Sequence, residues 1–181
     1  MRLCTLIACV FVATASAQEI STGPDKEKPV PALKVHDVTG INMGKEIDYA
    51  AERKDKPTIY LMINAQKFDR PMAQYLRKLD EALQKDTSDS YAVAVWLTDT
   101  AEKTKEYLPI AQRSLDFQKT ALAYYSGDLT GPKDWNINTD AHLTTVIVVQ
   151  GKVAAVFGYR SLNATDVPAV KEAFEKALGK K

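Results

Sequence analysis

The chain has 181 residues, of which 24 are lysine or arginine and 23 are aspartate or glutamate, giving a formal net charge of +1. This balance excludes the strongly basic field with which many proteins attract nucleic acid, so nucleic acid is not an expected partner. The length fits one domain with a substantial hydrophobic core.

The N-terminus has the pattern of a secretory signal peptide spanning residues 1–17. Arg2 precedes an apolar run, and Ala15 and Ala17 provide the small residues of a cleavage site, so cleavage is expected after Ala17. The pattern predicts an exported protein, either periplasmic or extracellular. A minor alternative reads "LIAC" as a lipoprotein box that carries a lipid on Cys9.

Both cysteines of the chain, Cys4 and Cys9, lie inside this signal. The mature chain is therefore expected to contain no cysteine. After the signal, no apolar run approaches the roughly 20 residues that a membrane span requires. No membrane span is expected in the mature protein.

Residues 18–30, "QEISTGPDKEKPV", have the polar and proline-containing composition of a flexible leader, so the folded domain is predicted to cover residues 31–181. A half-buried strand is expected in "ALKVHDV", followed by a short helix within "KEIDYAAERK". The continuous apolar run "TIYLMI" at 58–63 is typical of a strand buried on both faces.

Apolar residues spaced by three and four predict an amphipathic helix over 70–85. A second buried strand follows at 91–97, then a helix that Pro109 is expected to break or kink, and a third strand at 121–125. "TTVIVV" and "KVAAVFGY" flank "QG" and predict a β-hairpin, which a final helix follows. Strands alternating with helices predict an α/β fold with a mixed sheet covered on both faces.

The order of these elements resembles the thioredoxin-like superfamily, particularly its secreted redoxins and the alkyl hydroperoxide reductase/thiol-specific antioxidant group. The segment "KPTIYLMINAQKFDRP" is similar to the lysine-proline, strand, loop and helix in which that family places its Cys-x-x-Cys motif. The resemblance implies a three-layer α/β/α fold with a C-terminal β-hairpin and helix. It also places the four motif positions at Lys67, Phe68, Asp69 and Arg70.

Two features of the family's active site are missing from this chain. No cysteine stands at the motif, and Thr144 takes the position at which family members carry a cis-proline before the hairpin. Disulfide exchange and thiol peroxidase chemistry both proceed through a thiolate. The mature protein is therefore predicted to be neither a thiol-disulfide oxidoreductase nor a thiol peroxidase, and no catalytic residue is assigned.

The charged residues of the junction allow two interpretations. Lys67 and Arg70, at the start of a helix, could attract a small anion or a partner's carboxylate, with Asp69 nearby. Alternatively, these are solvated charges and Asp69 is an ordinary N-cap. Phe68 could be exposed to a partner peptide or fold inward against Met72.

Three further residues are expected to border the same surface if the resemblance holds. Thr144 and Thr145 could lie where an extended peptide pairs with the backbone, or be ordinary strand residues. Trp135, on the long loop before that strand, could line a groove or fill the edge of the core.

No cofactor or metal site is predicted, because His36 and His142 lack ligand spacing. The sequence thus favours an exported, redox-inactive domain that binds a protein, a peptide or a small anionic ligand at the position of the missing cysteines. The alternative is an enzyme that uses the charged residues for chemistry without a thiol.

Overall fold

The computed structural model describes residues 20–180, in which seven strands form one mixed sheet in the order β2-β1-β5-β4-β3-β6-β7. At its centre β3 (Thr58–Asn64), β4 (Tyr91–Thr98) and β5 (Thr120–Ser126) run parallel to one another. The antiparallel hairpin of β6 (Leu143–Val149) and β7 (Lys152–Tyr159) extends the sheet beside β3.

The other edge of the sheet is made by β1 (Lys34–Asp37) and β2 (Glu46–Asp48), which pair antiparallel. β2 and the short helix α1 (Tyr49–Arg53) share the segment expected to be helical. Every residue of β3 is buried, because the sheet is covered on both faces. A continuous apolar run is the sequence pattern expected for a strand whose two faces are both buried in this way.

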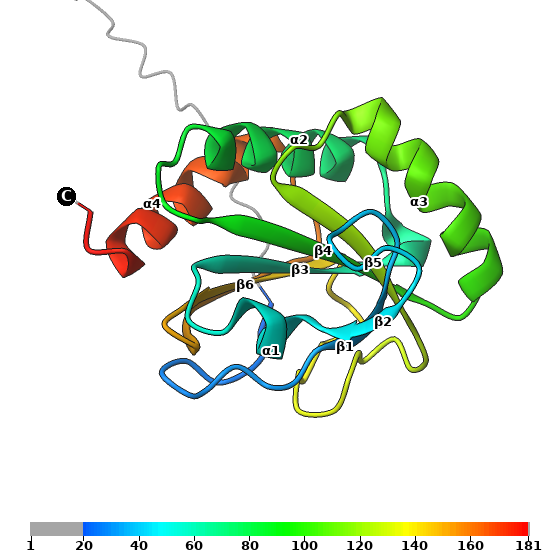
Figure 1. Ribbon diagram of the computed structural model, residues 1–181, viewed down its shortest axis with the longest axis horizontal. Helices are drawn as coiled ribbons and strands as arrows, with labels where there is room; N and C mark the ends of the chain where they lie inside the picture. The colour runs from blue at the N-terminus through cyan, green and yellow to red at the C-terminus, as the bar shows by residue number, and fades with distance from the viewer. Residues whose placement is uncertain (1–19, 181) are drawn as a thin grey trace, which may run out of the picture.

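Three helices cover one face of the sheet (Figure 1): α2 (Arg70–Gln84), α3 (Ala101–Leu115) and α4 (Val167–Ala177). Single-turn 3₁₀ helices, η1 (Ala65–Lys67) and η2 (Ala164–Asp166), precede α2 and α4. The apolar stripe of α2 faces the sheet as its spacing predicted; its buried apolar residues are Met72, Tyr75, Leu76, Leu79 and Leu83. This helical face holds the larger cluster of core side chains.

The break expected at Pro109 is wrong, since α3 continues as one helix on both sides of the proline. A proline inside a helix removes one backbone hydrogen bond. Here Leu108 and Ala111, which flank the proline, are both buried against the sheet. Core packing on each side therefore holds the helix together.

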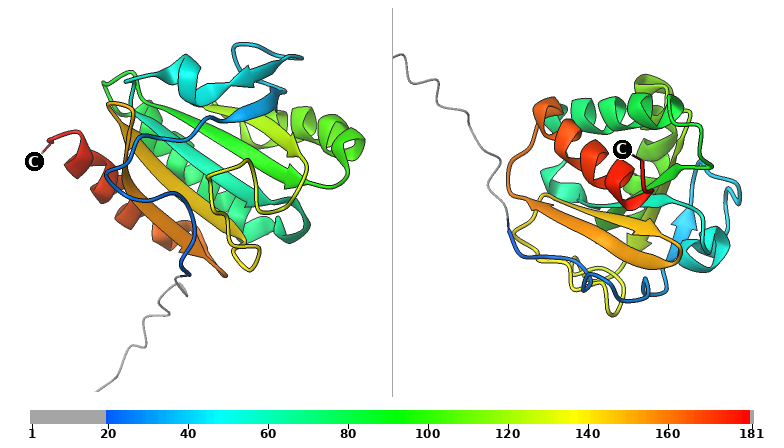
Figure 2. Two further views of the ribbon diagram at one scale, coloured as in Figure 1. Left: turned by 90° about the horizontal axis from the view of Figure 1, so that it is seen from below. Right: turned by 90° about the vertical axis from the view of Figure 1, so that its left-hand side faces the viewer.

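The opposite face has a thinner cover, made of α1, the loop of residues 127–142 and the N-terminal segment (Figures 1 and 2). Trp135 lies in that loop and is fully buried. The three-layer arrangement is thus present, but one of its outer layers consists mainly of irregular chain.

Residues 20–30 of the segment expected to be a flexible leader are docked onto the fold. Figure 2 (left) shows residues 20–30, in blue, crossing the β6–β7 hairpin. The Ile20 N–H donates to the Gly158 carbonyl (3.1 Å), and the Glu27 N–H donates to the Val153 carbonyl (2.8 Å). A Cβ on Gly158 would lie 2.2 Å from the Ile20 carbonyl oxygen, so only glycine permits this approach. The folded unit therefore includes residues before Pro31, because polar side chains and prolines do not prevent backbone pairing.

The proposed signal peptide with its cleavage point, Cys4 and Cys9 lie outside the described residues. Within residues 20–180, no helix is both long enough and apolar enough to cross a membrane.

Candidate functional site

The junction between β3 and α2 is fixed by two polar side chains. Asn64, the last residue of β3, accepts a hydrogen bond from the Gln66 N–H (3.1 Å) and donates to the Thr139 carbonyl (3.4 Å). Asp69 accepts a hydrogen bond from the Met72 N–H (2.9 Å), so it is the N-cap of α2. The capping interpretation of Asp69 is confirmed.

Phe68 folds inward and is half-buried. Its ring centroid lies 5.2 Å from that of Trp96 and 6.2 Å from that of Tyr107. Trp96 is buried beneath it, whereas Tyr107 keeps 41% of its surface exposed. The inward orientation is therefore correct, and the ring packs on aromatic partners from β4 and α3.

Two hollows meet at this aromatic cluster of Phe68, Trp96 and Tyr107. The first has a volume of about 420 Å³ and lies between the junction and the start of α3. The second has a volume of about 610 Å³ and lies between α2 and α3. Phe68 and Tyr107 line both hollows. Together they form a surface with an apolar centre at the ends of β3 and β4.

The charged side chains around this surface differ in whether they have interaction partners within the chain. Asp69 caps α2, and Asp99 accepts a hydrogen bond from the Gln66 side chain (3.3 Å). Three cations, Lys67, Arg70 and Lys103, are exposed. None of them has a carboxylate oxygen of another described residue within 4.0 Å of its side-chain nitrogens. The acidic groups are thus held by the chain's own donors, while these cations remain available.

Partial burial raises the pKa of Tyr107 above its usual range. The hydroxyl is protonated at neutral pH, as an unshifted tyrosine would also be, and it can donate a hydrogen bond.

Thr144 and Thr145 do not reach this surface, because both are completely buried. As neighbours in a strand they point to opposite faces of the sheet. Thr145 lies within hydrogen-bond distance of the Tyr75 hydroxyl beneath α2 (3.1 Å), and Thr144 meets the Thr22 hydroxyl on the other face (2.9 Å). Their expected role in a binding surface is therefore wrong, and both are strand residues of the core.

Thr144 is also the second residue of β6 rather than the residue before it. Its partners across the ladders are Met62 of β3 and Gly158 of β7, so neither side of the strand is open there. The residue immediately before β6 is His142, whose carbonyl accepts a hydrogen bond from the Asn64 N–H (3.0 Å). An extended peptide has no free backbone to pair with at Thr144.

Trp135 fills the core, which confirms the second of the two interpretations given for this residue. Its indole N–H donates to the Ala32 carbonyl (3.0 Å), and its ring meets Tyr60 edge-on with centroids 5.5 Å apart. It closes the face opposite the helices and does not line the aromatic hollows.

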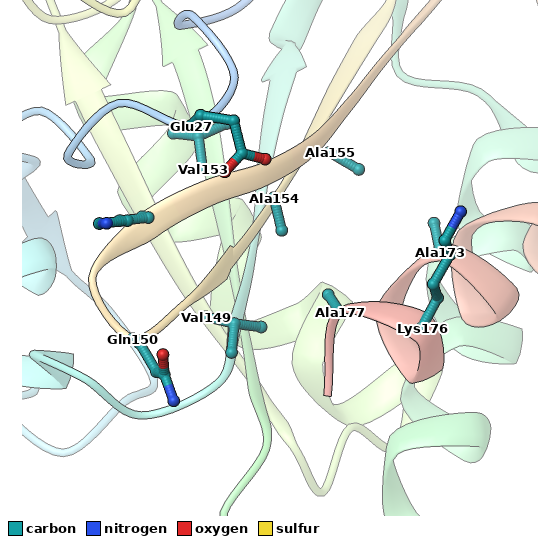
Figure 3. A pocket seen from close by; sticks show the side chains of 10 residues that line it. Glu27, Val149, Gln150, Val153, Ala154, Ala155, Ala173, Lys176 and Ala177 are labelled. Atoms are coloured by element: carbon teal, nitrogen blue, oxygen red, sulfur yellow. The ribbon is translucent and has the colours of Figure 1, made fainter. Parts of the chain in front are cut away.

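A further hollow of about 640 Å³ lies between β7 and α4 (Figure 3). Its nearest walls are the small side chains of Ala154, Ala173 and Ala177, with Lys176 and Glu27 at the rim. No aromatic side chain lines it. It therefore lacks the aromatic rings that line both hollows at the junction.

Within the part of the chain that the structure describes, no three histidine, cysteine or acidic side chains are grouped to hold a metal ion. His36 is in β1 and His142 precedes β6, and three strands separate β1 from β6. The two histidines therefore do not meet. His36 instead stacks on Tyr124 (4.9 Å between ring centroids).

The sequence analysis did not identify Trp96, Tyr107 or Lys103 as part of this surface. One signal was available for Trp96, which lies two residues before the end of a parallel strand neighbouring β3. The carboxyl ends of parallel strands meet at one edge of a sheet, where ligands commonly bind. Tyr107 gave no such signal, since its side chain is placed by the packing of α3.

No protein-family model matches the chain, and no curated protein matches its sequence. Among solved structures, it is similar to a putative thiol:disulfide interchange protein DsbE from Chlorobium tepidum, with a TM-score of 0.60 and 16% identity over 86% of this chain and 99% of that one. It is also similar to the peroxidoxin BcpB from Mycobacterium tuberculosis, with a TM-score of 0.59 and 12% identity over 86% and 97%.

A third similar structure is the pneumococcal exposed lipoprotein thioredoxin from Streptococcus pneumoniae, with a TM-score of 0.58 and 13% identity over 81% and 99% of the two chains. The chain has a thioredoxin-like fold. This confirms the fold expected from its sequence resemblance. In this thioredoxin-like fold, Lys67, Phe68, Asp69 and Arg70 run from the end of η1 to the first residue of α2, and residues 20–180 contain no cysteine.

Proposed function

We propose that the protein is an exported, redox-inactive thioredoxin-like domain that binds a protein, a peptide or a small anionic ligand beside the start of α2. One observation carries this proposal: an aromatic cluster with a half-exposed rim lies between two hollows at the junction of β3 and α2. Exposed apolar surface beside uncommitted cations is suited to binding rather than to stabilising the fold.

The absence of redox activity is inferred from sulfur chemistry. The two cysteines of the chain are at positions 4 and 9, far in sequence from the start of α2 at Arg70. No other natural side chain replaces a thiolate in disulfide exchange. Export is inferred from the signal pattern of residues 1–17, with lipid anchoring at Cys9 as the minor alternative.

The alternative of an enzyme without a thiol gains no support at this site. Asp69 is committed to capping α2, and Lys67 and Arg70 are open to solvent. Catalytic groups usually converge in an enclosed pocket where water is excluded.

The test is a pull-down from the exported fraction of the native source with residues 18–181 as bait. Wild type is compared with Phe68→Ala and with Ile41→Ala as a matched control, because Ile41 is also apolar and is 64% exposed on the β1–β2 loop. We expect a partner that wild type and the Ile41 variant retain and the Phe68 variant loses. Equal recovery by all three proteins would contradict the proposed site.

A parallel assay of insulin reduction and peroxide turnover addresses the redox part of the proposal. We expect both rates to equal the blank for wild type. Turnover above the blank in pure protein would refute the inferred redox inactivity.

A further inference from the structure

The two hollows at the aromatic cluster adjoin each other beside α3, and we treat them together as one groove. Phe68 and Tyr107 line both hollows, so an occupant of one can reach the other across these rings. Ile110 is one turn after Tyr107 on the same side of α3 and is 55% exposed. The groove and its margin therefore present an aromatic ring and an aliphatic side chain to solvent.

Positive charge exceeds negative charge by one in the lining of the two hollows: Lys103, Arg70 and Arg77 stand against Asp99 and Asp69, and the excess lies in the second hollow. Lys103 lines the first hollow, and Arg70 lines the second. Neither forms an ion pair with another described residue. Arg77 also lines the second hollow, although it already pairs with Glu81 (3.3 Å).

The start of α3 adds to this positive character. α2 and α3 both begin at this edge of the sheet, after the parallel strands β3 and β4. Asp69 caps α2, but the N-cap residue of α3, Thr100, makes no capping hydrogen bond with its side chain. The first N–H groups of α3 therefore lack a side-chain acceptor and lie beside Lys103 in the first hollow.

We infer that the partner presents an acidic segment with at least one bulky apolar side chain. One carboxylate binds at the start of α3 beside Lys103, the apolar side chain covers Phe68 and Tyr107, and a second carboxylate pairs with Arg70. Charge complementarity favours this chemistry, because Lys103 and Arg70 have no ion-pair partner among the described residues, whereas Asp99 and Asp69, which keep their charge, already accept hydrogen bonds from the chain. The inference rests on the proposed function and specifies its partner.

The test uses a synthetic peptide that alternates glutamate with leucine and phenylalanine, and a matched peptide with lysine in place of glutamate. Both are titrated into residues 18–181 and followed by amide chemical shifts. The fluorescence of Trp96 gives a second readout, because this residue lies directly beneath Phe68. We expect the acidic peptide to bind at least about tenfold more tightly, with shifts along α3 and at the start of α2.

Two charge-reversal variants and one control locate the contact. Lys103→Glu and Arg70→Glu should each weaken binding of the acidic peptide by about fivefold or more. Lys105→Glu should not, because Lys105 is exposed on the same helix but lines neither hollow. Raising the salt to about 1 M should weaken binding, since it shortens the Debye length to about 3 Å.

Equal binding of the two peptides, or equal effects of the Lys103 and Lys105 reversals, would overturn the inference. If the partner from the exported fraction still requires Phe68 in either case, the proposed function stands and only the acidic partner is rejected. If partner capture is also independent of Phe68, both proposals fail.

Discussion

The start of α2 and the start of β6 were expected to share one binding surface, but the structure treats them differently. At the start of α2, the aromatic side chains of Phe68 and Tyr107 are partly exposed between two hollows. At β6, Thr144 is buried beneath Thr22 of the N-terminal segment, which crosses the hairpin. The chain's own N-terminal segment thus covers one half and leaves the other accessible. Binding is therefore expected across the helices rather than by strand pairing.

The closed half should be the more costly to disturb, and Trp135→Ala provides the largest expected effect. Trp135 is fully buried and its indole N–H is hydrogen-bonded to the Ala32 carbonyl. Truncating this side chain to alanine should therefore lower the free energy of unfolding by about 3–5 kcal/mol. Urea denaturation measures this loss. Trp135→Phe should cost less, and a loss under about 1 kcal/mol for the alanine variant would show that this face is loosely packed.

A single hydroxyl group in the closed half should have a smaller effect. The Thr22 hydroxyl meets Thr144 and accepts a hydrogen bond from the Asn138 N–H (2.9 Å). Thr22→Val keeps the side-chain shape but leaves these groups without their partner, which should cost about 1–3 kcal/mol. Thr22→Ser is the control, since it keeps the hydroxyl. Equal stability of the valine and wild-type proteins would mean that the docked segment contributes little.

The open half should show the reverse pattern, with a small effect on stability and a large one on binding. Phe68 is only half-buried, so Phe68→Ala should cost about 1 kcal/mol in urea denaturation. The same variant should lose its partner in the pull-down. Phe68→Leu should retain part of the apolar contact and an intermediate affinity. A cost as large as that of Trp135→Ala would mark Phe68 as a core residue.

The smallest expected effect concerns the cap of α2. Asp69→Ala removes the acceptor for the Met72 N–H and should cost about 0.5–1 kcal/mol. Asp69→Ser restores a capping oxygen without the charge and should recover most of that loss. Thermal unfolding of the two variants separates capping from charge, and equal melting temperatures for both would argue that the cap is unimportant.

The fold was largely predictable, because buried strands and amphipathic helices have strong periodic signals. The apolar run before Asn64 became β3, and the spacing after Pro71 became the buried face of α2. Local rules failed where tertiary packing opposes them. Pro109 did not interrupt α3, because buried residues on either side hold the helix to the sheet.

The site was less predictable, because side-chain exposure depends on contacts between distant segments. Lys67, Phe68, Asp69 and Arg70 lie together at the junction of β3 and α2, and their role in binding stays a prediction. The burial of Thr144 depends on Thr22, which lies 122 residues away in sequence. Tyr107 enters the site only because α3 packs next to the junction. No local pattern in the sequence predicts the contact of Thr144 with Thr22 or the contact of Tyr107 with Phe68.

The docking of Ile20 onto Gly158 also limits how far the domain can lie from any anchor at the N-terminus. In the lipid-anchored alternative, the chain between Cys9 and Ile20 reaches at most roughly 35–40 Å when fully extended. Such a tether would hold the domain close to the lipid surface and restrict the partners it could reach. Release by cleavage after Ala17 would remove that limit, leaving only two residues ahead of Ile20.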